Sequence, residues 1–182
     1  YKRQTYNASL CMKDVLLKHH IDSHHINILY GRNATLSNFN NAINWLKLRS
    51  DYNDRIILHI TAHGYYGGFC MIDGDIPYIT LSDKLNEIEF NGIFIIVDGC
   101  HSGSAIPHLQ ANKRVIVTSC NANEVALNHQ LSNAVISAIE VGDNVGNLNG
   151  WLSAEDIHYF LLQQYGDTPY YDGYRGDLNI IK

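Results

Sequence analysis

The chain has 182 residues, of which 46% are hydrophobic and 17% charged, and its formal net charge is −5. This composition supplies a full hydrophobic core, excludes a disordered chain and favours a single domain over residues 1–182. Acidic residues outnumber basic ones, 18 to 13, and no basic tract is present, so we expect no nucleic-acid partner and no membrane partner. The apolar runs are also far shorter than the roughly 20 residues of a membrane helix.

The first elements in chain order are helical, with one short strand between them. Residues 8–19 carry an apolar stripe and predict an amphipathic helix, and residues 26–30 predict a short strand. After a turn at 31–33, Thr35 is expected to cap a helix over 36–48, whose apolar positions repeat with a helical period.

The middle of the chain predicts a buried strand followed by a hairpin. Residues 50–54 form a polar loop, and residues 55–61 are apolar on both faces, which is typical of a buried parallel strand. The segments 69–72 and 76–79 flank a turn and predict a hairpin beside the main sheet. A short helix is expected over 81–88.

Strands and helices continue to alternate in the second half. Residues 93–97 and 114–118 predict buried strands, and residues 131–139 and 157–161 predict helices. Such alternation indicates an α/β fold with a mostly parallel sheet covered on both faces. The usual first strand would precede the helix at 8–19, so we expect either that it lies upstream of Tyr1 on a separate segment or that the sheet begins elsewhere. Because the chain starts with Tyr1 rather than Met, we expect a processed product or an excised domain.

Two of these strands run into chemically reactive residues. The strand at 55–61 is followed by His63 and Gly64, and the strand at 93–97 is followed by Asp98, Gly99 and Cys100. Ligands bind beyond the carboxyl ends of parallel strands, so neighbouring strands would bring imidazole and thiol to one cleft. A nearby imidazole lowers the pKa of a thiol and can protonate a leaving amine. The glycines leave room for backbone N–H groups to reach a substrate oxygen.

These two segments resemble the signatures of a known enzyme group. Ala-His-Gly at 62–64 and Asp-Gly-Cys-His-Ser-Gly at 98–103 are similar to the two motifs of the caspase-like (clan CD) cysteine peptidases. The cysteine motif is closest to that of metacaspases. The helix at 36–48 and the segments 150–156 and 171–174 resemble legumain-type peptidases. The resemblance implies a caspase-like three-layer α-β-α sandwich.

The resemblance also implies roles for individual residues. Cys100 would be the nucleophile and His63 the general acid and base, and the backbone N–H groups of Gly64 and Cys100 would form the oxyanion hole. A polypeptide substrate would be cut through an acyl-enzyme, with no metal or other cofactor in the chemical step.

The residue preference depends on Asp98, whose position in the family lines the pocket for the residue on the acyl side of the cut. A carboxylate there favours a basic side chain by charge complementarity. Legumains also carry an acid there but pair it with an arginine before the first helix and select Asn; Arg3 stands near that place. Ser119 and Asn121 follow the next strand and would form another pocket wall. Basic residues are slightly favoured, with Asn and Asp next; Asp98 would alternatively cap a helix or turn.

Two rival functions and two weaker sites stay open. A legumain-like transpeptidase would let an amine intercept the acyl-enzyme, and a non-catalytic caspase-like module would serve assembly, although such a module needs neither the dyad nor its glycines. The histidine cluster at 19–25 has no metal-site spacing. The segment 147–156 resembles a calcium loop, but its first ligand would be Val145, so a helix capped by Ser153 and Asp156 is favoured.

Overall fold

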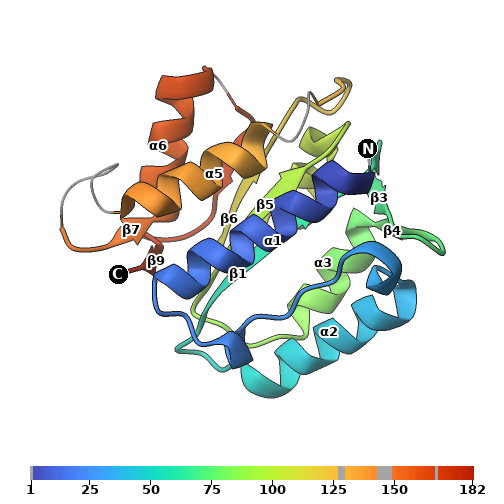
Figure 1. Ribbon diagram of the computed structural model, residues 1–182, viewed down its shortest axis with the longest axis horizontal. Helices are drawn as coiled ribbons and strands as arrows, with labels where there is room; N and C mark the ends of the chain where they lie inside the picture. The colour runs from blue at the N-terminus through green and yellow to red at the C-terminus, as the bar shows by residue number, and fades with distance from the viewer. Residues whose placement is uncertain (1, 127–129, 143–148, 167) are drawn as a thin grey trace.

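The computed structural model describes residues 2–126, 130–142, 149–166 and 168–182, without the side chains of residues 2–7 and 165. Its centre is a four-stranded sheet with helices on both faces, which is a three-layer α/β architecture (Figure 1). No helix of these described residues is long and apolar enough to cross a membrane.

The central sheet has the strand order β1-β5-β6-β8. The strands are β1 (Arg55–Thr61), β5 (Gly92–Asp98), β6 (Arg114–Thr118) and β8 (Tyr170–Asp172). The first three are parallel, and β8 is antiparallel to β6. Every residue of β5 is buried, which explains its uninterrupted apolar sequence.

Alternate residues of the central strands face two separate cores. Phe94 and Ile96 pack against three helices on one face, namely α1 (Lys2–Lys18), α5 (Gln130–Val141) and α6 (Ala154–Tyr165). Ile93 and Ile95 pack against three helices on the other face, namely α2 (Leu36–Arg49), α3 (Tyr78–Asn86) and α4 (Ile106–Leu109). The period of two in a strand thus fixes which side chains meet which helices.

The remaining elements are short. A three-stranded antiparallel sheet follows β1 directly and consists of β2 (Gly64–Tyr65), β3 (Gly68–Cys70) and β4 (Asp75–Pro77). A two-stranded sheet pairs β7 (Leu152–Ser153) with β9 (Asn179–Ile181). Short 3-10 helices among the described residues include η1 (Ser23–His25), η2 (Gly31–Asn33) and η3 (Ser102–Ala105).

Local sequence signals explain two helix starts. The side chain of Thr35 accepts a hydrogen bond from the backbone N–H of Asn38, so the predicted cap of α2 is confirmed. Ser153 and Asp156 form a reciprocal capping box at the start of α6, as predicted. Val145 would occupy the first ligand position of the calcium loop that the segment 147–156 resembles, and it lies outside the described residues.

The predicted strand at 26–30 is wrong. Tyr30 has extended dihedral angles, but residues 26–30 belong to no strand, because they pair with no other strand of the described chain. A strand needs a hydrogen-bonded neighbour as well as a suitable sequence.

Several predicted boundaries are also shifted. The first helix begins at Lys2 rather than residue 8, and residues 78 and 79, expected in the hairpin, open α3. The strand β1 is an edge strand of the described sheet, and of its residues only Ile56 and Ile60 are buried. A further strand beside β1, supplied from outside the chain, stays a prediction.

Candidate active site

The two strands that end in His63 and Cys100 are neighbours, as predicted. β1 and β5 pair in parallel with Thr61 opposite Asp98, and the backbone N–H of Ala62 donates to the carbonyl oxygen of Asp98 at 3.2 Å. His63 and Cys100 each stand two residues beyond this last pair. Imidazole and thiol therefore leave the sheet at the same edge and from adjacent strands.

Two glycines let the loops beyond these strands touch through their backbones. A Cβ atom built on Gly64 would overlap the carbonyl oxygen of Cys100, and one built on Gly99 would lie 2.5 Å from the carbonyl oxygen of Ala62. Real Cβ atoms do not approach backbone that closely. Glycine is therefore required at both positions for close approach, and the contact brings the segment around His63 against Cys100.

Serine side chains hold the loop that carries Cys100. The hydroxyl of Ser119 accepts from the backbone N–H of Gly99 and donates to its carbonyl oxygen, both at 3.1 Å. The fully buried hydroxyl of Ser102 accepts from the backbone N–H groups of Ser119 at 3.1 Å and Cys120 at 3.2 Å. Ser119, predicted to line the substrate pocket, thus has its hydroxyl engaged in bracing this loop.

A second set of bonds joins the two loops to each other. The hydroxyl of Ser104 donates to the carbonyl oxygen of His101 at 2.6 Å and accepts from the backbone N–H of Gly67 at 2.9 Å. The backbone N–H of Cys70 donates to the carbonyl oxygen of His63 at 2.8 Å. The β2–β3 turn is thereby tied both to the histidine segment and to the cysteine loop.

His101 adopts a left-handed backbone conformation directly after the predicted nucleophile. Its φ is 58°, which is uncommon for a residue other than glycine. Its backbone N–H donates to the carbonyl oxygen of Glu124 at 2.8 Å, and its Nδ1 lies 3.0 Å from the carbonyl oxygen of Ala122. These bonds stabilise the sharp turn that exposes Cys100 at the edge of the sheet.

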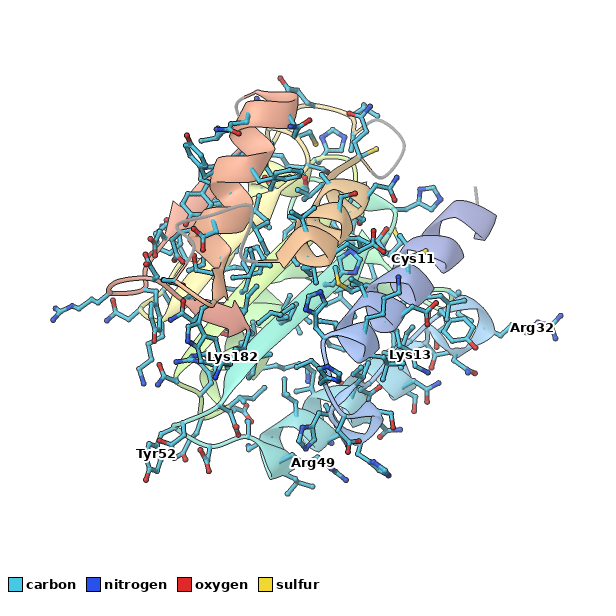
Figure 2. All side chains as sticks on the ribbon, turned by 60° about the vertical axis from the view of Figure 1, so that its left-hand side comes forward. Cys11, Lys13, Arg32, Arg49, Tyr52 and Lys182 are labelled. Carbon is cyan, nitrogen blue, oxygen red and sulfur yellow. The ribbon has the colours of Figure 1, made fainter. Side chains whose placement is uncertain are left out.

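The cysteines differ in their surroundings. Cys100 is half-buried and His63 is exposed, so both predicted catalytic residues are accessible to a ligand. Burial, and then the carboxylate of Asp75, raise the pKa of the Cys70 thiol. Cys120 is buried, whereas Cys11 is exposed on α1, as Figure 2 shows. All four thiols are free.

Asp98 is almost completely buried, with 1% of its surface exposed. Its Oδ2 accepts the backbone N–H of Ser132 at 2.8 Å, in the first turn of α5. Its Oδ1 is also buried and meets no hydrogen-bond partner among the described side chains and backbone. The alternative prediction of a helix cap is confirmed, but it accounts for only one of the two carboxylate oxygens.

Arg3 is another residue predicted to line the substrate pocket. Arg3 lies within α1 rather than in a loop before it, which corrects the prediction, and its side chain is not described. Figure 1 shows the N-terminal end of α1 toward the edge at which the parallel strands end.

Asn121 is exposed, and its backbone N–H and Nδ2 both donate to the carboxylate of Glu124 at 3.0 Å, which lowers the pKa of Glu124. Sequence reasoning missed Glu124, because no local signal marks it.

A hollow at the opposite edge of the sheet does not belong to this site. It has a volume of about 380 Å³ and is lined by residues that include Asn86, Lys113 and Arg114. Arg114 is buried, and its guanidinium donates to the carbonyl oxygen of Leu109 at 2.9 Å, to Ser82 at 3.2 Å and to Asn86 at 3.0 Å. These bonds join the ends of α3 and α4 to β6, so we interpret Arg114 as structural.

A comparison with protein families finds a match for this chain. The family model described as "Peptidase C13 family" matches residues 2–137, from α1 into α5, and so includes both strand ends. No curated protein matches the chain. The match spans well over half of the chain. The chain therefore belongs to the peptidase C13 family, the legumain family of cysteine endopeptidases within the caspase-like clan.

Proposed function

We propose that Cys100 and His63 are the catalytic dyad of this cysteine endopeptidase. The observation that carries the proposal is the backbone contact between residues 62–64 and 99–100 at the ends of adjacent parallel strands. This edge of a parallel sheet is where ligands bind, and the family to which the chain belongs uses a thiol for peptide hydrolysis.

The reaction follows from the chemistry of the two groups. The Cys100 thiolate attacks the peptide carbonyl carbon, and the C–N bond breaks as His63 protonates the leaving amine. Water then hydrolyses the thioester, with His63 accepting its proton, and the thiol is regenerated. The backbone N–H groups of Gly64 and Cys100 are the proposed donors to the oxyanion, and glycine at position 64 lets the two segments approach, because a Cβ there would overlap the carbonyl oxygen of Cys100.

The preference that we propose is for a basic residue on the acyl side of the cut. Asp98 supports this proposal, because a nearly buried carboxylate with one unbonded oxygen is costly unless a cation or donor completes it. No described cationic side chain forms an ion pair with Asp98. The guanidinium or ammonium group of a substrate Arg or Lys would supply the missing partner.

The test compares matched fluorogenic peptides that end in Arg, Lys, Asn or Asp before the cut. We expect the highest kcat/KM for Arg and Lys, and a loss of about a hundredfold for these two peptides in Asp98→Asn. The Asn side chain can still accept the Ser132 N–H, so this variant changes the charge and keeps the cap.

Arg3 decides between the basic pocket and a mixed one. If Arg3 pairs with Asp98, the pocket is already neutral and offers both a donor and an acceptor, which suits the amide of Asn. A preference for Asn that disappears in Arg3→Ala but persists in Lys2→Ala would therefore overturn the basic preference. Lys2 is the matched control, because it carries the same charge on the same helix.

A further inference from the structure

A buried serine links Asp98 to a histidine on the neighbouring strand. Nε2 of His59 and the hydroxyl of Ser132 share a hydrogen bond of 2.8 Å, and the backbone N–H of the same serine donates to Oδ2 of Asp98 at 2.8 Å. Ser132 is fully buried, Asp98 is 1% exposed and His59 is half-buried. One residue of α5 therefore contacts β1 through its side chain and β5 through its main chain.

The register of the sheet explains why these groups meet. His59 lies opposite Ile96, and Ile96 belongs to the core beneath α1 and α5. Asp98 is two residues beyond Ile96 and points to the same face. His59 and Asp98 thus approach the first turn of α5 from neighbouring strands. Backbone N–H groups in that turn have no acceptor within their own helix, so Asp98 supplies one.

We propose that His59 is a positioning residue that sets the substrate preference through Ser132 and Asp98. His59 fixes the first turn of α5 against β1, and the N–H of Ser132 then holds Oδ2 of Asp98. With that oxygen fixed, the direction of Oδ1 toward the substrate side chain is fixed as well. The inference rests on the proposed function of Asp98, but it assigns His59 no contact with substrate and no part in bond cleavage.

We expect the loss of the bond between His59 and Ser132 to weaken substrate binding and to leave the rate of the chemical step nearly unchanged. In His59→Ala and in Ser132→Ala we expect KM for the Arg and Lys peptides to rise about tenfold, while kcat changes less than about twofold. His59→Gln places an amide nitrogen where Nε2 stands and should restore most of the binding. The double variant His59→Ala/Ser132→Ala should be no worse than either single variant, because both remove the same bond.

A matched control is an exposed histidine far from this chain of bonds. His25 lies in η1 and is exposed, so His25→Ala should leave both KM and kcat unchanged. An equal rise of KM in His25→Ala would show that the effect of His59→Ala is not specific and would overturn the proposal.

Hydrogen exchange of the Ser132 amide tests the same proposal without any substrate. We expect exchange to become at least about tenfold faster in His59→Ala and to stay near the wild-type rate in His59→Gln. If Asp98→Asn leaves the preference unchanged, the proposed function of Asp98 fails, and the exchange result alone decides whether His59 positions the helix. If Asp98→Asn abolishes the preference while His59→Ala changes neither KM nor the exchange of Ser132, only the role of His59 is overturned.

Discussion

At the scale of single residues, the candidate site depends on the lack of a side chain at Gly64 and at Gly99. Both positions need glycine because backbone from the opposing loop occupies the place of a side chain. Neither residue has a positive φ, so the requirement is one of space rather than of backbone conformation.

Gly64→Ala tests this packing. The added methyl group would collide with the carbonyl of Cys100, and the collision can be relieved only by separating the two loops. We expect kcat/KM to fall at least about a hundredfold, since small displacements of reacting groups have such effects, while stability falls by about 1–3 kcal/mol. Wild-type activity in a folded Gly64→Ala protein would contradict the described contact.

The positions of His63 and Cys100 at the ends of neighbouring strands could be predicted from the sequence, because their signal is local. His63 and Cys100 each follow an apolar run, and the glycines stand beside them. Ser132 and Glu124 carry no such signal, since Ser132 contacts Asp98 and the carbonyl oxygen of Glu124 contacts His101, both of which are distant in sequence. The sequence predicts Ser119 and Asn121 near the site, but their hydrogen bonds to Gly99 and Glu124 depend on loop geometry that no residue pattern encodes.

At the scale of elements, the strands that are buried along their whole length are the ones whose bounds the sequence predicts accurately. The strands β5 and β6 are buried along their whole length, and the predicted ranges 93–97 and 114–118 agree with them to within one residue at each end, because apolar runs are a strong signal. The segment 26–30 is apolar except for Asn27 and has extended geometry at Tyr30, yet it has no partner strand among the described residues. Pairing is a property of the assembled sheet, so the sequence pattern alone could not exclude it.

The start of α6 offers a prediction about charge burial. Glu155 lies in its first turn, where Oε2 accepts the backbone N–H of Leu178 at 2.8 Å, and burial raises the pKa of its carboxyl group. A group with a raised pKa in the folded protein contributes stability that is present below its unfolded pKa and is lost as pH rises through the folded one. The ionised form therefore destabilises the fold at neutral pH.

Glu155→Gln removes this charge and keeps an oxygen for the N–H of Leu178. We expect its Tm to exceed that of the wild type at neutral pH, and the difference to vanish at a pH below the ordinary range of a glutamate carboxyl. Thermal unfolding followed by circular dichroism at both pH values checks the sign. An exposed glutamate such as Glu89 supplies the control, because Glu89→Gln should change Tm at neither pH.

At the scale of the whole molecule, the buried Arg114 and the candidate active site lie at opposite edges of the sheet. Arg114 stands at the edge where the parallel strands begin and joins helices α3 and α4 through neutral acceptors. The opposite edge gathers the ends of β1, β5 and β6, where His63, Cys100 and Ser119 lie. Two cores, one on each face, hold the strands in register, so the site inherits its geometry from the sheet.

The most direct measurement is the rate at which iodoacetamide labels each cysteine at about pH 6, read by mass spectrometry. Iodoacetamide reacts with the thiolate and not with the thiol, so fast labelling at this pH marks a cysteine that a neighbouring base activates. We predict labelling of Cys100 at least about tenfold faster than labelling of Cys11, although Cys11 is the more exposed. Cys70, whose pKa is raised, and buried Cys120 should also be slow.

The same rates in variants complete this measurement. His63→Ala should slow the labelling of Cys100 to the rate of Cys11, His25→Ala should not, and Cys100→Ala should fold with no peptidase activity. Equal rates for Cys100 and Cys11 in the wild-type protein, or fast labelling of Cys100 that persists in His63→Ala, would contradict the assignment of these two residues as the catalytic dyad.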